Sequence, residues 1–285
     1  MRKIILILSA QIIIVLSSCV KDADIELPNS DPMLVVSSFI SPQDSLVQVA
    51  VSLSNPLYTN HQANSKYAPL LNASVIINNG ISDYILDYNS KLERYVIDTM
   101  KLKIIAGNTY YLYVRSPDGK LVNAITTIPL QNTSFHFVVV KDQVDLNKYT
   151  LKGTWKDPIN TTDYYVFDVR YTSFSLYSGY SSIFGSFTDT IKIWDGGTYY
   201  VKDSQSDGST FDRNEIFIYN PAKNDTVFTS LTTISEEYFN YQDKFNLAYQ
   251  SLSTPFSEPV QMYTNIKGGL GIFASFNTNR MRVFP

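Results

Sequence analysis

The chain has 285 residues, of which 44% are apolar and 17% are charged, and its 26 acidic residues outnumber its 23 basic residues. Proteins bind nucleic acid and anionic lipid headgroups through basic patches, so this mildly acidic composition argues against both partners. A single cysteine excludes an internal disulfide and a thiolate metal cluster. Stability must therefore come from burial, for which 21 Tyr and 16 Phe supply aromatic side chains that favour strands.

The N-terminus has the layout of a secretory signal peptide. Arg2 and Lys3 form a positive start, and residues 4–16 are almost entirely apolar. This apolar run is shorter than the roughly 20 residues that span a bilayer. The sequence LSSC that ends at Cys19 resembles the bacterial lipobox, which implies removal of residues 1–18 and lipidation of Cys19. A plain signal peptide with an incidental cysteine is the alternative.

Residues 19–32 read as a polar, acidic tether. Lys21 and Asp22 stand just behind the cysteine, and Ala23 interrupts the acidic run. This stretch resembles the export signals that send Bacteroidota surface lipoproteins to the outer leaflet, whereas the alternative is a solvated linker on the periplasmic side. We expect a protein that is lipid-anchored to the outer membrane and faces the cell exterior. Two or more acyl chains are needed for stable anchoring, and a triacylated cysteine supplies them.

Residues 33–130 are predicted to form an N-terminal immunoglobulin-like β-sandwich. Val47, Val49 and Val51 alternate with polar or small residues, which is the period of a half-buried strand. Several further short strands follow, separated by turn signals such as the PDG sequence at residues 117–119. Short strands at this spacing are typical of an antiparallel sandwich.

Residues 131–285 are predicted to form a second β-rich domain with one helix. Trp155 precedes a Lys-Asp-Pro turn and a Tyr-rich strand, an order that resembles fibronectin type III domains and places Trp155 in the core. Residues 235–252 carry aromatic side chains at helical spacing, which predicts an amphipathic helix that covers a sheet. The predicted fold class is therefore mostly β, with two antiparallel β-sandwich domains that meet near Pro129.

Local motifs for catalysis or cofactor binding are absent from the sequence. The histidines are His61 and His136, and neither a G-x-S-x-G elbow nor a phosphate loop nor a dinucleotide fingerprint occurs. Paired carboxylates for glycoside hydrolysis stay open, because such residues are distant in the chain. We expect no catalytic residues and no cofactor, and a surface hydrolase ranks last among the functional alternatives.

The stretch DSQSDGSTFDRNE matches a calcium-binding loop in part. Asp203, Asp207 and Gly208 occupy the first, fifth and sixth positions of the loop, but Gln205 stands at the third. The required final glutamate falls one residue late, at Glu215. A plain Asp-Gly turn explains the pattern equally simply, so we assign no metal site and leave calcium binding by this loop open.

A stretch rich in aromatic, serine and glycine residues is the predicted ligand-binding feature. Rigid rings supply contact area in recognition surfaces, while small polar residues supply adaptable hydrogen bonds. Such a surface suits a glycan or a peptide. An irregular strand pair with its rings in the core is the alternative. The candidate binding residues are Tyr171, Phe174, Tyr177, Tyr180 and Phe184.

The order of several motifs resembles the Bacteroidota lipoproteins grouped as domain of unknown function 4249. They are DIELPNSDPMLVVSSFI, VQVAVSLSNPL, GNTYYLYVRSPDGK, WKDP, DYYVFDV, SEEYFNY and PFSEPVQMYTNIKGGLGIF. The resemblance runs from Cys19 to Phe276. It departs at Ala274-Ser275, where a glycine pair is expected, and at the longer loop of residues 203–214.

The resemblance implies a place beside a TonB-dependent outer-membrane receptor, because members are similar to accessory lipoproteins of such transporters. It carries over no functional residues. The leading expectation is an accessory protein that helps a TonB-dependent receptor to capture or take up a ligand. A structural or adhesive surface lipoprotein is the runner-up.

Overall fold

The structure, a computed structural model, consists mainly of strands arranged in several sheets. It describes residues 31–54, 68–173, 177–181, 185–189, 192–203, 207–219, 226–251, 257–258 and 260–283. The first strands are β1 (Leu34–Ile40), β2 (Leu46–Leu53), β3 (Ser74–Asn78), β4 (Asp83–Ile85), β5 (Asp87–Asn89), β6 (Arg94–Asp98), β7 (Thr109–Arg115) and β8 (Leu121–Thr127). The later elements are β9 (His136–Lys141), β10 (Lys148–Lys156), β11 (Tyr164–Ser173), β12 (Tyr177–Ser181), β13 (Gly185–Asp189), β14 (Lys192–Lys202), β15 (Thr210–Tyr219), β16 (Thr226–Ile234), α2 (Glu236–Ser251) and β17 (Leu270–Val283).

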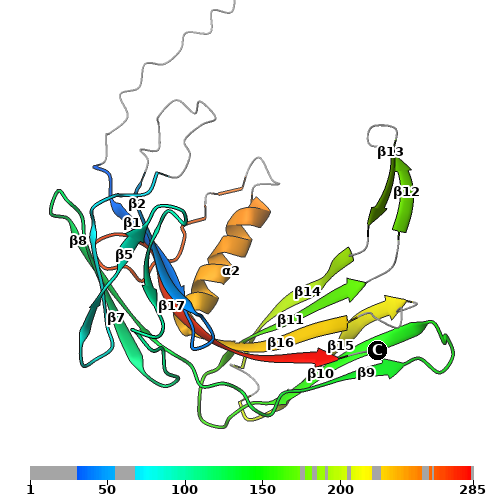
Figure 1. The fold of residues 1–285 in the computed structure, drawn as a ribbon. Coiled ribbons are helices and arrows are strands. Elements are labelled where there is room, and N and C mark those ends of the chain that lie inside the picture. The colour runs from blue at the N-terminus through cyan, green and yellow to red at the C-terminus, as the bar shows by residue number, and fades with distance from the viewer. Residues whose placement is uncertain are drawn as a thin grey trace, which may run out of the picture.

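One eight-stranded sheet runs through the whole molecule, in the order β14-β11-β16-β17-β1-β2-β6-β5. The C-terminal strand β17 joins its two halves by changing partner along its length (Figure 1). Up to Ser275 it lies parallel to β1, and from Phe276 onward it lies antiparallel to β16. The last strand of the chain therefore belongs to both halves of the fold.

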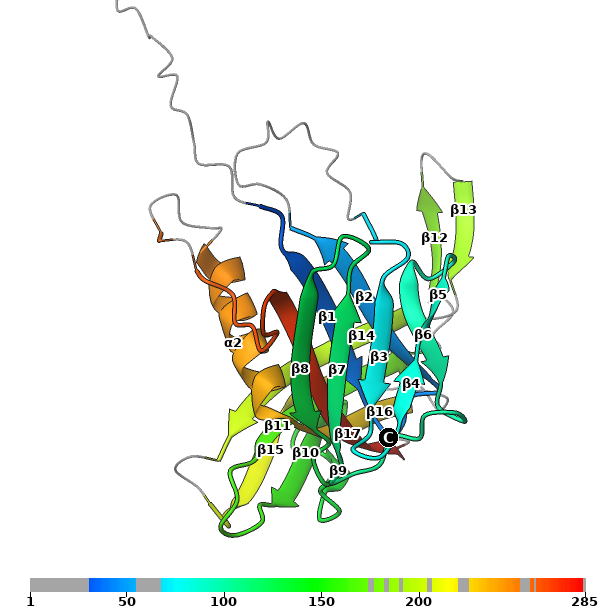
Figure 2. The same cartoon turned by 90° about the vertical axis from the view of Figure 1, so that its left-hand side faces the viewer.

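The first core lies between one end of this sheet and a four-stranded sheet of order β4-β3-β7-β8, which stands in front of it in Figure 2. Strand β1 alternates buried and half-buried residues, as a strand at the edge of a core does. The PDG turn joins β7 to β8 as predicted, and Gly119 supplies the positive φ of 91° that this turn needs.

The second core lies between β14, β11, β16 and β17 on one side and a three-stranded sheet of order β15-β10-β9 on the other. Trp155 is 0% exposed, and its ring stacks on Phe211 with centroids 5.3 Å apart. The prediction that Trp155 is a core residue is confirmed. His136 is exposed between the buried Phe135 and Phe137, as the alternation of β9 predicts.

The mostly β fold class with a helix is confirmed, but two separate antiparallel sandwiches are not. Ile266 and Phe273, which the sequence assigns to the second domain, pack in the first core. The pairing of β17 with β1 is also parallel. Gly271 allows this close approach, because a Cβ atom there would lie 1.9 Å from the carbonyl oxygen of Val36.

Helix α2 matches the helix expected over residues 235–252. Ser235 caps its first turn, where its hydroxyl accepts a hydrogen bond from the backbone N–H of Tyr238. The ring of Tyr238 lies 4.8 Å from that of Phe39 and 6.2 Å from that of Phe276. None of the helix residues is fully buried, and its second half exposes several apolar side chains. The helix therefore covers the sheet with its first turns only.

Within the described ranges, no helix is both long and apolar enough to cross a membrane.

A polar seam ties β17 to the segment between the two cores. The side-chain amide of Asn277 donates to the carbonyl of Pro129 at 2.9 Å and accepts from Gln43 Nε2 at 2.7 Å. Ser275 Oγ donates to the carbonyl of Thr127 at 2.7 Å. Both Asn277 and Ser275 are buried. Because buried polar groups are costly when unpaired, these bonds hold the two halves in one relative position.

Candidate functional site

The candidate site is a groove of about 680 Å³ on the face of the large sheet that points away from the second core. Strand β11 shows how the sequence builds it. Tyr165, Phe167 and Val169 are buried in the second core, so the residues between them face the opposite side. We call this hollow the sheet groove. The side chains on which the argument depends are Asp168, Arg170, Tyr200, Phe228, Tyr238 and Arg280.

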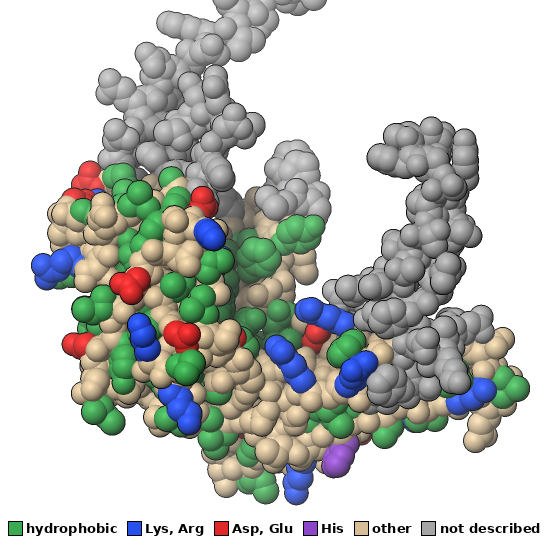
Figure 3. All heavy atoms as spheres, in the orientation of Figure 1, with side chains coloured by type: hydrophobic (Ala, Val, Ile, Leu, Met, Phe, Trp, Pro, Cys, Tyr) green, Lys and Arg blue, Asp and Glu red, His purple; other side chains and the backbone are tan. Residues whose placement is uncertain are grey.

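Helix α2 flanks the sheet groove. Tyr238, near the start of the helix, lines it together with residues of β11, β14, β16 and β17. In Figure 1 the β12–β13 hairpin rises on the same side of the sheet as α2, from its far end. Figure 3 shows this face hollowed beside the helix, with basic side chains in blue gathered over the sheet.

The sheet groove carries more positive than negative charge. Arg170 Nε lies 3.2 Å from Asp168 Oδ2, and the other oxygen of Asp168 accepts from the hydroxyl of Thr198 at 2.9 Å. Asp168 is therefore already paired. Arg280 is exposed and forms no salt bridge within the described part of the chain. Its charge acts on Asp44, whose pKa it lowers against the larger effect of burial. Without a salt bridge, its guanidinium can bind an anionic or hydroxyl-rich ligand.

The tyrosines of the sheet groove stay protonated at neutral pH. Burial, and then the neighbouring Tyr238 and Asp168, raise the pKa of Tyr200 to about 12. Burial also raises the pKa of Tyr238. Beside them the ring of Phe228 is 43% exposed, with the guanidinium of Arg282 5.5 Å from its centroid. Neutral hydroxyls and exposed rings can hydrogen-bond to and stack on a ligand.

The aromatic stretch predicted to bind ligand lies in and around the strands at the far end of the sheet. Tyr171 belongs to β11, and Tyr177 and Tyr180 belong to β12. Phe174 and Phe184 lie outside the described residues, and the structure describes the side chain of none of the five. Their role stays a prediction.

The residues predicted for lipidation and export also lie outside the described part of the chain. These are Cys19, residues 1–18 and all but the last two residues of the tether. His61 is outside it as well. Lipidation therefore stays a prediction.

A second pocket, of about 750 Å³, lies at the junction of the two cores. It is lined by Ile128 and Pro129, by the loop of residues 158–165, and by the start of α2. Burial, followed by the charge of Glu236, raises the pKa of Tyr164 there. We call it the junction pocket. Its apolar walls and acidic rim differ from the positive sheet groove.

The partial calcium-loop motif folds into a cluster with a member that the motif did not include. Asp203 and Asp207 lie beside Asp157, and one carboxylate oxygen of each lies within 4.8 Å of the others. Asp157 belongs to the WKDP sequence, 46 residues before Asp203. Sequence reasoning missed this association because no local pattern links the two segments. The side chain of Glu215 is not described.

Sequence reasoning also missed Asp168, Arg170 and Arg280. The sequence DYYVFDVR contains the signal for two of them, because Asp168 and Arg170 alternate there with the apolar Phe167 and Val169. The alternation does not show that the sheet is hollowed into a groove on the face that carries these residues.

The comparisons identify the family but no named relative. No curated protein matches the chain. The model of the family described as "Domain of unknown function" matches residues 20–282, which covers the described strands and helix almost completely. The chain therefore belongs to the family Domain of unknown function (DUF4249).

Proposed function

We propose that this protein is a lipid-anchored outer-membrane accessory protein that captures a ligand in the sheet groove and presents it to a TonB-dependent receptor. The observation that carries the proposal is the sheet groove itself, in which Arg280 has no salt-bridge partner among the described residues and an exposed ring lies nearby. We expect this surface to bind a ligand and not to catalyse a reaction, because its one carboxylate, that of Asp168, is already paired with Arg170 and Thr198.

The ligand class follows from these side chains. An exposed guanidinium selects carboxylate, sulfate or phosphate groups, and neutral tyrosines with an exposed ring suit hydroxyls and sugar faces. We infer a glycan or peptide that carries anionic groups. We infer that the β12–β13 hairpin, which carries Tyr177 and Tyr180, extends this surface.

The anchor is proposed from the sequence. The LSSC stretch supplies Cys19 for lipid, and the family match begins at residue 20, directly behind it. The Lys-Asp-rich tether supports the outer leaflet. Replacement Cys19→Ser is expected to abolish fatty-acid labelling and to release the protein from membranes. A serine variant that stays in the membrane fraction would refute the anchor.

The two cores also support a finer description of the fold. We infer two sandwich-like domains, residues 33–130 and residues 131–285, that share β17. The first domain then acts as a spacer next to the tether, and the second carries the sheet groove. The polar seam keeps the groove at a constant angle to the spacer.

An adhesive function is the second candidate. The observation that favours it is the β12–β13 hairpin, which extends from the body like a tip (Figure 1). Adhesion requires exposure on intact cells but no transporter partner. Protease treatment of intact cells decides the exposure, because a hairpin that resists cleavage until cells are opened would exclude adhesion.

The experiment that tests uptake is growth of a strain that lacks the protein. We expect slower growth on the substrates that the neighbouring transporter imports, and normal growth on glucose or another substrate with its own route. Complementation with the intact gene should restore growth, whereas the Cys19→Ser gene should not. Normal growth of the deletion strain on every imported substrate would remove the basis of the proposal.

A further inference from the structure

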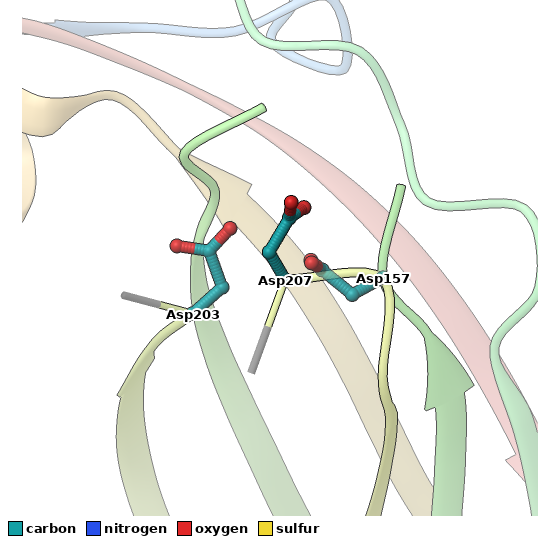
Figure 4. Close-up of side chains that lie close together, drawn as sticks. All are labelled: Asp157, Asp203 and Asp207. Atoms are coloured by element: carbon teal, nitrogen blue, oxygen red, sulfur yellow. The ribbon is translucent and has the colours of Figure 1, made fainter. Parts of the chain in front are cut away.

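Three aspartates from two segments of the chain lie close together in the second half of the fold (Figure 4). Asp157 follows the last residue of β10, Asp203 follows the last residue of β14, and Asp207 lies in the turn that leads to β15. Asp157 and Asp203 are each 1% exposed, whereas Asp207 is exposed. The cluster therefore has a buried floor and one side open to solvent.

The hydrogen bonds of the protein satisfy Asp157 but not Asp203. Tyr165 donates its hydroxyl to Asp157 Oδ1 at 2.6 Å, and the backbone N–H of Gly208 donates to Oδ2 at 3.0 Å. Asp203 Oδ2 accepts from the backbone N–H of Asp163 at 3.0 Å, but Asp203 Oδ1 is buried and has no hydrogen-bond partner among the described residues. A buried carboxylate oxygen without a donor is costly, so this atom indicates a missing ligand.

The charges of the cluster are also uncompensated by the protein. Among the described residues, no lysine or arginine forms a salt bridge with any of the three aspartates. Like charges this close are unfavourable unless a cation lies between them.

We propose that Asp157, Asp203 and Asp207 bind a calcium ion. The donors are carboxylate oxygens only, which suits a hard cation such as Ca²⁺ and not zinc, which prefers nitrogen and sulfur. Two ligands of one Ca²⁺ at about 2.4 Å can lie at most about 4.8 Å apart. The three oxygens meet that limit. Water completes the coordination shell on the open side next to Asp207.

This site differs from the calcium loop that the sequence matches in part. A loop of that type draws its ligands from twelve consecutive positions. Here Asp157 takes the place of the later loop positions, and it directly follows β10, the strand that carries Trp155. A bare Asp-Gly turn explains Asp207 and Gly208, but it does not explain why two further aspartates are buried beside them.

The ion would restrict the motion of residues 158–163, the segment that forms one wall of the junction pocket. Pro158, Thr161 and Asp163 line that pocket, and they lie between Asp157 and β11. Asn160 is already tied to the cluster, because its backbone N–H donates to Asp207 Oδ1 at 2.9 Å. Bound calcium therefore stabilises the second core and this wall together. The inference does not depend on the proposed role in uptake.

The test uses the full mature chain, extracted in mild detergent and stripped of metal with EDTA. Thermal unfolding is followed with CaCl₂ up to about 10 mM, a range that covers weak extracellular sites, and calorimetry gives the affinity. Matched variants are Asp203→Asn, which keeps an acceptor oxygen, Asp207→Asn at the exposed position, and Asp243→Asn on the exposed surface of α2 as the control.

Calcium is expected to raise the unfolding temperature of the wild type and of Asp243→Asn alike. Asp207→Asn should bind calcium at least about tenfold more weakly, as loss of a coordinating group does, and Asp203→Asn should show no calcium-dependent shift. If Asp203→Asn does not fold, Asp207→Asn decides. The proposal is overturned if the wild type shows no shift with calcium, if magnesium alone produces it, or if Asp207→Asn binds as tightly as the control.

Discussion

The side-chain amide of Asn277 donates a hydrogen bond to the carbonyl of Pro129 at 2.9 Å, across the boundary between the two cores. The same side chain accepts from Gln43, which in turn accepts from the backbone N–H of Thr278. One asparagine on β17 thus joins the turn between β1 and β2, the connecting segment and the C-terminal strand. It lies where β17 changes partner, next to the sheet groove.

Replacement Asn277→Ala is therefore expected to destabilise the protein by about 1–3 kcal/mol, because it leaves a buried carbonyl and the Gln43 amide unpaired. Urea unfolding measures the change. The control is Asn246→Ala on the exposed face of α2, which should change stability by no more than about 0.5 kcal/mol. Equal values for the two variants would show that the seam contributes nothing.

The parallel approach of β17 to β1 requires glycine at position 271. Gly271 has a φ of 111°, and a Cβ would lie 1.9 Å from the carbonyl oxygen of Val36. Gly80 also has a positive φ, of 89°, but nothing lies within 4 Å of its Cβ position. Gly80→Ala should therefore cost about 1–2 kcal/mol of backbone strain, whereas Gly271→Ala should prevent folding. Soluble yield and circular dichroism of the two variants distinguish these outcomes, and a well-folded Gly271→Ala protein would contradict the observed strand pairing.

Stability at alkaline pH should depend on Tyr200. Its pKa rises from 10.0 to about 12 on folding. Between these values the native state keeps a proton that the unfolded state has lost, so stability falls as pH increases through this window. In Tyr200→Phe this part of the fall is absent. Urea unfolding midpoints at two alkaline pH values measure this fall, and Tyr111→Phe on β7 is the control. If the midpoint fell equally steeply with pH in the wild type and in Tyr200→Phe, the assignment would be refuted.

Arg280 is expected to matter for ligand capture and not for folding. Because it is exposed and makes no salt bridge with the described residues, Arg280→Met should change the free energy of unfolding by no more than about 0.5 kcal/mol. It should weaken binding of an anionic ligand about tenfold or more, as loss of a charge-assisted contact does.

The matched control for Arg280 is Arg115→Met, which removes the same charge from an exposed position on β7. Cells that carry each variant can be compared for growth on the imported substrates. Equal growth of the two variants would show that the sheet groove is not the capture surface.

Local features of the fold could be predicted because their causes are local. The Asp118-Gly119 turn, the helix that follows Ser235 and the buried Trp155 each depend on neighbouring residues or on a simple period. The alternation of β9 likewise places His136 on the surface.

The long-range features could not be predicted, because their partners are far apart in the chain. Val35 pairs with Leu270, and no sequence pattern marks a parallel pair at that separation. Asp157 meets Asp203 only because β10 and β14 end at the same edge of the second core. For the same reason the alternation of β11 indicates two faces, but not that Arg170 and Arg280 share one groove.

The measurement that tests the central claim most directly is co-purification from the outer membrane. The protein carries a C-terminal tag, membranes are extracted in mild detergent, and the proteins that travel with it are identified and quantified. We expect a TonB-dependent receptor in stoichiometric amount, and its loss from Cys19→Ser cells. Recovery of the protein alone, while it remains open to protease on intact cells, would contradict the receptor partnership and favour the adhesive function.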